Sequence, residues 1–271
     1  MTNVRQLLSL LLFVCAAASL AAAENKLTLG VTDASQALAE KDFAALLVHM
    51  NAAPDLKVAI RAYPTYDALA DALREKKVDV AVLGAVKYVE AHDSFGAVPL
   101  VSEGGKVTTV IFVRKDSPIT SPAQLKGKKV AFGYEDSTST YLMPLLLLSK
   151  YHVAVQELAK SGFLGSQQDK IIDAVLSGEY DAGAVVAPVF DRYADKIRAL
   201  ERSEPFPGGP VVVNRDFDVA LAQRISQLFV AFKATDAQRN QRFAHGATLI
   251  TDTDFNKIRF LCKVLFHKTY H

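Results

Sequence analysis

Four consecutive hydroxyl residues, Ser137 to Thr140, separate a strand-like run from an apolar run. They lie within the segment GYEDSTSTYLMP, which follows the β-rich residues 129–132 and leads into the apolar residues 141–148. One Ser or Thr is enough to cap a helix, because its side-chain oxygen accepts one unpaired N–H group. Four consecutive hydroxyl residues are more than a cap needs, and the remaining hydroxyl groups can donate to the oxygens of an anion.

The start of a helix suits an anion for two further reasons. Its first N–H groups lack partners, and its dipole is positive there. A bound oxyanion therefore meets donors directly. No Lys or Arg occurs between residues 130 and 149, so neutral groups would hold the anion. Capping alone remains the alternative, since Ser and Thr are ordinary cap residues.

Strand and helix patterns alternate along the chain, as in an α/β fold with parallel strands. The apolar, β-branched runs predict strands at 26–31, 56–62, 78–83, 107–113, 130–132, 181–186 and 211–213. The periodic apolar runs predict helices at 35–50, 66–76, 121–125, 141–151, 170–176, 219–232 and 254–266.

Two such β-α-β series, joined by extended crossings near 110 and 211, indicate two lobes. We expect a first lobe from 24–113 and 211–271, with a second lobe from 114–210 inserted in it. This layout places a cleft between the lobes, and closing of the lobes can bury a ligand there.

Met1 to Ala23 has the features of a secretory signal peptide. Arg5 is the only charge before Glu24, an apolar core spans 7–20, and three alanines precede Glu24 as a cleavage site. A membrane anchor is the alternative, but the apolar core is short for a span and no stop-transfer charges follow it. We therefore expect an exported protein that begins near Glu24.

Cleavage would also remove Cys15 and leave Cys262 as the only cysteine. No intramolecular disulfide could then form. The apolar neighbours of Cys262 predict a buried, unreactive thiol.

The charge pattern argues against nucleic acid as a partner. The chain has 31 Lys and Arg against 29 Asp and Glu, and the two signs are interspersed rather than clustered. The residues after the signal segment contain no zinc-type Cys/His spacing. We expect neither a metal nor a cofactor.

The run Val130 to Pro144 resembles the signature of the phosphate/phosphite/phosphonate-binding periplasmic proteins, which serve ABC importers. That signature has Ser-Thr-Ser at a helix start, followed by an aromatic residue, an apolar pair and Pro. Weaker similarities follow in the same order at 66–69, 78–81, 84–91, 98–100, 115–119, 125–128, 174–185 and 252–259. The resemblance covers most of the chain after the signal segment and implies the two-lobe type II periplasmic binding fold.

The resemblance also implies roles for five residues. Ser137, Thr138 and Ser139 would hold the oxygens of a phosphorus oxyanion. Tyr66 would donate its phenol from the opposite wall of the cleft. Gln168 stands where the family often has a histidine, and an amide can donate there without carrying charge.

The family's known partners and location follow from the same resemblance. It implies a monomeric, periplasmic protein without enzymatic activity that delivers its ligand to an ABC transporter permease. A sensor subunit that presents the bound oxyanion to a membrane histidine kinase is the alternative. An enzyme is disfavoured on the residues themselves, because Ser137 has no His or Lys base at a recognisable spacing.

The chain departs from the family in the acidic part of the site. Aminoalkylphosphonate binders place carboxylates at positions that here are near Pro188 and in the loop 207–210. A buried ammonium group without a negative partner costs several kcal/mol. The resemblance therefore favours a compact ligand, namely phosphate, phosphite or a simple phosphonate.

The intact mass of the exported protein tests the signal peptide. We expect the mature chain to begin at Glu24 or within a few residues of it. A mass that retains residues 7–20 would instead indicate an anchored protein.

Overall fold

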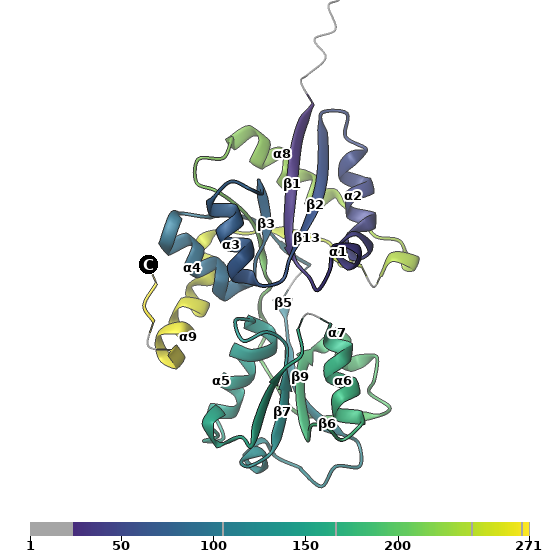
Figure 1. Ribbon diagram of the computed structural model, residues 1–271, viewed down its shortest axis with the longest axis vertical. Helices are drawn as coiled ribbons and strands as arrows, with labels where there is room; N and C mark the ends of the chain where they lie inside the picture. Colours follow the sequence, from purple (N-terminus) through teal and green to yellow (C-terminus); the bar gives the residue numbers. More distant parts are fainter. Residues whose placement is uncertain (1–23, 105, 166, 240, 267, 271) are drawn as a thin grey trace, which may run out of the picture.

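Two mixed β-sheets, each flanked by helices, form the upper and lower lobes in Figure 1. The structure is a computed structural model that describes residues 24–104, 106–165, 167–239, 241–266 and 268–270. The proposed signal segment, residues 1–23, lies outside the described residues.

The first sheet has six strands in the order β13-β4-β12-β3-β1-β2. Its strands are β1 (Asn25–Thr32), β2 (Leu56–Tyr63), β3 (Val80–Val82), β4 (Val98–Glu103), β12 (Pro210–Val213) and β13 (Ala247–Leu249). β1 pairs in parallel with β2 and β3, whereas β12 pairs antiparallel with both β3 and β4. The expected parallel pairing is found among β1, β2 and β3, and the returning chain adds antiparallel strands to the same sheet.

The second sheet has five strands in the order β10-β6-β9-β7-β8. They are β6 (Thr109–Arg114), β7 (Lys129–Phe132), β8 (Lys160–Phe163), β9 (Ala182–Val186) and β10 (Ile197–Arg202). β7 is parallel to β8 and β9, and β6 is antiparallel to β9 and β10.

A two-stranded ribbon connects the sheets. β5 (Lys106–Val107) pairs antiparallel with β11 (Phe206–Pro207), and β5 lies between the lobes in Figure 1. The two crossings therefore run side by side, a few residues before the expected positions 110 and 211. β6 already belongs to the second sheet from Thr109. The lobe bounds given above remain a prediction.

Helices flank both sheets. The first lobe carries α1 (Gln36–Asp42), α2 (Ala44–Asn51), α3 (Tyr66–Arg74), α4 (Ala85–Phe95), α8 (Val219–Ala231) and α9 (Asn256–Phe266). The second lobe carries α5 (Met143–Ser149), α6 (Gln168–Leu176) and α7 (Ala187–Asp191). Short 3-10 turns occur at Pro122–Leu125, Val155–Glu157, Asp236–Gln238 and Asp252–Phe255. None of the described helices is long and apolar enough to cross a membrane.

One predicted helix, 35–50, is broken. α1 ends at Asp42 and α2 begins at Ala44. Phe43, between them, has φ and ψ of −106° and 5°, which lie outside the helical region. The Phe43 side chain is fully buried and contacts Phe243, so its packing outweighs the continuous helical pattern. The buried, unreactive thiol expected at position 262 is confirmed: Cys262 has no exposed surface, and burial raises its pKa to about 11.

Aromatic packing ties the late part of the chain to the first lobe. The Phe229 ring in α8 lies 4.9 Å from the Phe243 ring, centroid to centroid, and Phe243 in turn lies 6.3 Å from Phe43. All three side chains are buried in one cluster with β1 and β12. This cluster holds the segment that contains Arg242 and Phe243 against the first lobe.

The substitution Phe229→Ala tests the cluster. Because the ring is fully buried, we expect the free energy of unfolding to fall by about 3–5 kcal/mol. Phe260→Ala is the matched control, since that ring is 64% exposed and its loss should change stability by about 0.5 kcal/mol or less. Chemical denaturation measures both, and equal effects would contradict the assigned packing.

Candidate anion-binding site

The hydroxyl run forms the irregular start of a second-lobe helix. Residues Thr138–Leu142 make a π-helical turn that continues directly into α5. Ser137 is the cap residue, and its Oγ accepts from the N–H of Thr140 at 3.2 Å. The first two N–H groups, of Thr138 and Ser139, make no hydrogen bond within the described residues. One hydroxyl therefore caps the helix, as expected, and donors remain for another partner.

Thr138 connects the two lobes. Its Oγ1 accepts from the backbone N–H of Val86 at 2.9 Å, in a buried contact. Val86 is the second residue of α4, so the start of a first-lobe helix meets the start of a second-lobe helix. Leu142, four residues after Thr138, packs into the apolar cluster that includes Val86 and Tyr88. The hydroxyl run is thus part of the contact between the lobes.

Ser139 is held by its backbone and keeps its side chain available. Its carbonyl accepts from Thr109 Oγ1 at 2.6 Å, and Thr109 is fully buried at the start of β6. The N–H of Thr109 donates to Ser203 Oγ at 2.9 Å, which fixes Thr109 in turn. The Ser139 hydroxyl makes no hydrogen bond within the described residues, so it is free to donate to a ligand.

Tyr66 approaches the same contact from the first lobe. It begins α3, which Thr65 caps, and its ring packs edge-on against Tyr134 with centroids 6.1 Å apart. Tyr134 lies only three residues before Ser137, so Tyr66 is brought close to the segment that carries the hydroxyl run. Burial raises the pKa of Tyr66 to about 12; Arg242 opposes this rise, and Asp136 adds to it. The phenol therefore stays protonated and can donate a hydrogen bond.

The side-chain amide of Gln168 uses its oxygen for a hydrogen bond within the protein. It begins α6, and its Oε1 accepts from the N–H of Val186, at the end of β9, at 2.8 Å. β9 also packs against the π-helical turn that carries the hydroxyl run. With its oxygen engaged, Gln168 has only its NH₂ group to offer a ligand, which makes it a donor without charge.

Charged groups near the site were not predicted from the sequence. The Arg242 guanidinium pairs with Glu103, with Nε 2.8 Å from Oε2, and Arg242 influences the Tyr66 phenol. Lys87, next to Val86, has a side chain only 12% exposed and pairs with Asp67 and Glu90. Both cations have acidic partners, so neither offers a full positive charge. Long-range contacts place these residues, and no local pattern in the sequence indicates them.

Of the two carboxylates just before the hydroxyl run, Glu135 is exposed and Asp136 is partly buried, and burial has the largest effect on the pKa of Asp136. Burial raises this pKa, and the nearby Lys87 ammonium partly offsets the effect. The described residues contain no group of three or more His, Cys, Asp or Glu placed to hold a metal ion.

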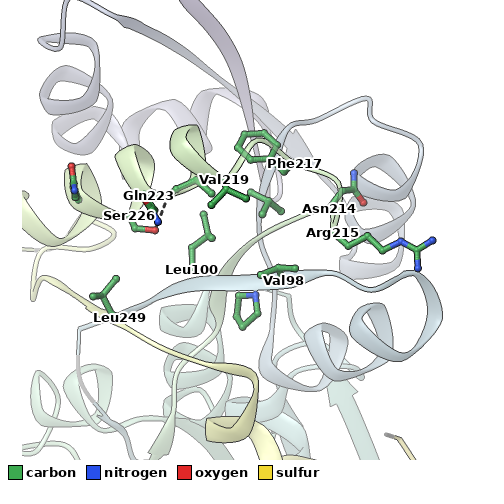
Figure 2. A pocket seen from close by; sticks show the side chains of 13 residues that line it. Val98, Leu100, Asn214, Arg215, Phe217, Val219, Gln223, Ser226 and Leu249 are labelled. Atoms are coloured by element: carbon green, nitrogen blue, oxygen red, sulfur yellow. Dashed lines mark hydrogen bonds between the residues drawn. The ribbon is translucent and has the colours of Figure 1, made fainter.

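A separate hollow of about 450 Å³ lies on the first lobe, between β4, β12 and α8 (Figure 2). Val98, Val219 and Leu249 line it and are exposed. Figure 2 shows mostly apolar side chains around it, and none of the five predicted site residues is among them. Its lining also includes the polar residues Asn214, Arg215, Gln223, Ser226 and Gln227, but no part of the hydroxyl run.

The family model of the ABC transporter phosphonate periplasmic substrate-binding protein matches residues 30–255. The chain belongs to this family. The matched range contains the hydroxyl run, Tyr66 and Gln168. Membership in a family of substrate-binding proteins agrees with the expectation that the chain is not an enzyme.

Individual members and fold relatives differ in what they bind. A probable phosphite-binding protein, PhnD1 of Prochlorococcus marinus, is 27% identical over 172 residues, which cover 59% of this chain and 58% of that protein. The alignment thus spans less than two thirds of the relative. A structure of PhnD1 with methylphosphonate matches 90% of this chain and 99% of that one, with a TM-score of 0.76 and 20% identity.

The same fold occurs in an alkanesulfonate-binding protein. SsuA of Xanthomonas axonopodis pv. citri, solved with MOPS, matches 91% of this chain and 94% of its own, with a TM-score of 0.61 and 20% identity. These structural matches confirm the type II periplasmic binding fold.

The buried contact between the lobes yields a testable consequence. Thr138→Val removes the acceptor of the Val86 N–H group and leaves that group unpaired, at a cost of about 1–3 kcal/mol. We expect the Val86 amide to exchange its hydrogen at least about fivefold faster, as NMR or mass spectrometry would measure.

Thr138→Ser is the matched control, because it keeps the hydroxyl oxygen. Protection of the Val86 amide should then stay near that of the parent protein. Unchanged protection in Thr138→Val would show that the two lobes are not joined by this hydrogen bond.

Proposed function

We propose that the chain is a periplasmic binding protein that captures a small phosphorus oxyanion for an ABC importer. One observation carries the proposal: a helix start at the contact between the lobes has unpaired N–H groups and an unpaired Ser139 hydroxyl. Family membership supports the same conclusion, since the family consists of phosphonate-binding components of ABC transporters.

The donors suit an oxyanion in number and charge. Ser137 and Thr138 use their oxygens as acceptors within the protein, so each keeps its hydroxyl hydrogen for a ligand. Ser139, the two backbone N–H groups, Tyr66 and the Gln168 amide add further neutral donors. The starts of α4 and α5 both contribute a positive electrostatic potential. This potential would stabilise an anion between them.

Closing of the lobes would bring these groups around the ligand. The antiparallel ribbon of β5 and β11 gives two adjacent crossings about which the lobes can rotate. Export by a cleaved signal peptide would place the protein in the periplasm, where such a carrier works. We propose a monomer that meets an ABC permease with its lobes closed.

The double substitution Ser137→Ala/Ser139→Ala tests the donors. Calorimetric titration with methylphosphonate should show binding weakened by about 2–4 kcal/mol, at roughly 1–2 kcal/mol for each hydrogen bond lost to a charged ligand. Ser139→Ala alone should lose about half of this without loss of thermal stability, because its hydroxyl has no partner in the protein.

Ser149→Ala, at the other end of α5, is the matched control and should bind as the parent does. If the double variant binds methylphosphonate as tightly as the parent protein, the hydroxyl run only caps the helix and does not bind the ligand.

Ligand preference follows from the missing acidic residues. We expect phosphate, phosphite or methylphosphonate to bind at least about tenfold more tightly than 2-aminoethylphosphonate, a difference of about 1.4 kcal/mol. Pro188 and Gly209 occupy the positions at which aminoalkylphosphonate binders would hold the ammonium group. Titration of all four ligands at one pH and salt concentration decides this. Tighter binding of the aminoalkyl compound would mean that another carboxylate accepts its ammonium.

A further inference from the structure

A buried carboxylate stands at the end of β1. Asp33 is only 8% exposed, and its own N–H donates to the carbonyl of Tyr63 at 3.0 Å. Its Oδ1 accepts from the N–H of Ala34 at 2.6 Å, whereas its Oδ2 makes no hydrogen bond within the described residues. The preceding residue, Thr32, also has a buried hydroxyl oxygen without a partner. Thr32 Oγ1 is thus a buried polar atom without a partner among the described residues, which is uncommon. Asp33 Oδ2 is not among the fully buried unpaired atoms, so it stays accessible to a ligand.

Sheet register places Asp33 beside the anion-binding site. β1 and β3 pair in parallel with Gly30 opposite Ala81, and the same register, continued just past the ends of both strands, would bring Asp33 level with Gly84. The Tyr66 ring covers Gly84: a β-carbon there would lie 3.5 Å from the ring. Two residues further on, Val86 donates to Thr138. In Figure 1, β1 runs toward the lower lobe, so its end lies at the side of the first sheet that faces that lobe.

The charged groups near Asp33 either have the same sign or are already paired. Burial raises the pKa of Asp42 at the end of α1, and repulsion from Asp33 adds to the rise. Arg242 acts on Asp42 in the opposite sense, but its guanidinium is already paired with Glu103. Tyr66, across Gly84, is uncharged. Asp33 therefore lacks a hydrogen-bonded or ion-paired cation among the described residues.

A carboxylate beside an oxyanion site discriminates by the proton that the ligand carries. An ionised carboxylate can only accept hydrogen bonds, and a deprotonated oxygen of the ligand can also only accept them. The carboxylate and that ligand oxygen therefore repel each other. A phosphonate or phosphate keeps one O–H up to its second pKa, which is about 6 for a phosphoryl group, and a neighbouring carboxylate acceptor favours this protonated form. A sulfonate has the same shape and no proton left to donate. Rejection of the wrong ligand by an unpaired acceptor is a recognised route to specificity.

We propose that Asp33, with Thr32 beside it, is the acceptor that admits a protonated phosphorus oxyanion and rejects a sulfonate of the same shape. The proposal rests on the proposed function and adds to it a specificity-determining residue of the first lobe. It also gives a physical reason for different ligands on one fold, since SsuA, which has this fold, is an alkanesulfonate-binding protein.

The experiment compares methylphosphonate with methanesulfonate by calorimetric titration of the mature protein. The parent should prefer methylphosphonate by at least about a hundredfold. In Asp33→Asn the amide oxygen still accepts from the Ala34 N–H group, and the NH₂ group can now donate to a sulfonate oxygen. We expect the preference to shrink by at least tenfold, chiefly because methanesulfonate binds more tightly.

Three further variants make the result decisive. Asp33→Ser repeats the test with a different side chain that can still accept from Ala34, in case Asp33→Asn is unstable. Glu135→Gln removes an exposed carboxylate near the hydroxyl run and should leave the preference unchanged. Asp136→Asn removes the competing, partly buried acceptor on the second lobe. A loss of preference in Asp136→Asn and not in Asp33→Asn would overturn the proposal.

The outcome also separates this inference from the proposed function. If the parent binds methylphosphonate and both Asp33 variants keep its preference, Asp33 is not the acceptor while the function stands. If the parent binds neither methylphosphonate nor any other phosphorus oxyanion, the proposed function fails, and the inference fails with it.

Discussion

The hydrogen bond from the Val86 N–H group to Thr138 Oγ1 sets the geometry on which the site depends. It joins the first turn of α4 to the first turn of the second-lobe helix, so two positive helix ends lie close together. Two such ends repel weakly unless negative charge lies between them. The hydroxyl run contains no basic residue, and nearby Lys87 and Arg242 are paired with acids. In the site that we propose, dipoles and hydroxyl groups would therefore hold the anion rather than a full cation.

This arrangement gives each part of the chain a role around the site. The ribbon of β5 and β11 carries the chain between the sheets, and the buried aromatic cluster at Phe229 holds the returning segment on the first lobe. β6 begins with Thr109, which fixes the carbonyl of Ser139. β9 ends with Val186, which orients the amide of Gln168. The donors come from separate elements, yet backbone hydrogen bonds position each of them.

The sequence was informative where the relevant physics is local. Ser137 caps its helix as the pattern of hydroxyl residues predicts, and the strands at 56–62 and 130–132 are found within one residue of their expected ends. The expected helix 35–50 is broken because packing of Phe43 decides its conformation. The partners Val86, Arg242 and Asp33 could not be predicted, because contacts distant in sequence or the register of neighbouring strands bring them to the site. The only local indication for Asp33 was that an acidic residue directly follows a predicted strand.

A shared fold does not fix the ligand, since proteins with this architecture bind phosphonates in one case and sulfonates in another. In the account proposed for this chain, the helix start would supply general affinity for an oxyanion, and the acceptors around it would determine which oxyanion binds. A crystal structure of the mature protein with methylphosphonate tests the central claim most directly. The account predicts phosphonate oxygens within hydrogen-bonding distance of the Ser137, Thr138 and Ser139 hydroxyl groups, between the lobes. Methylphosphonate bound elsewhere, with these hydroxyl groups satisfied by the protein alone, would contradict it.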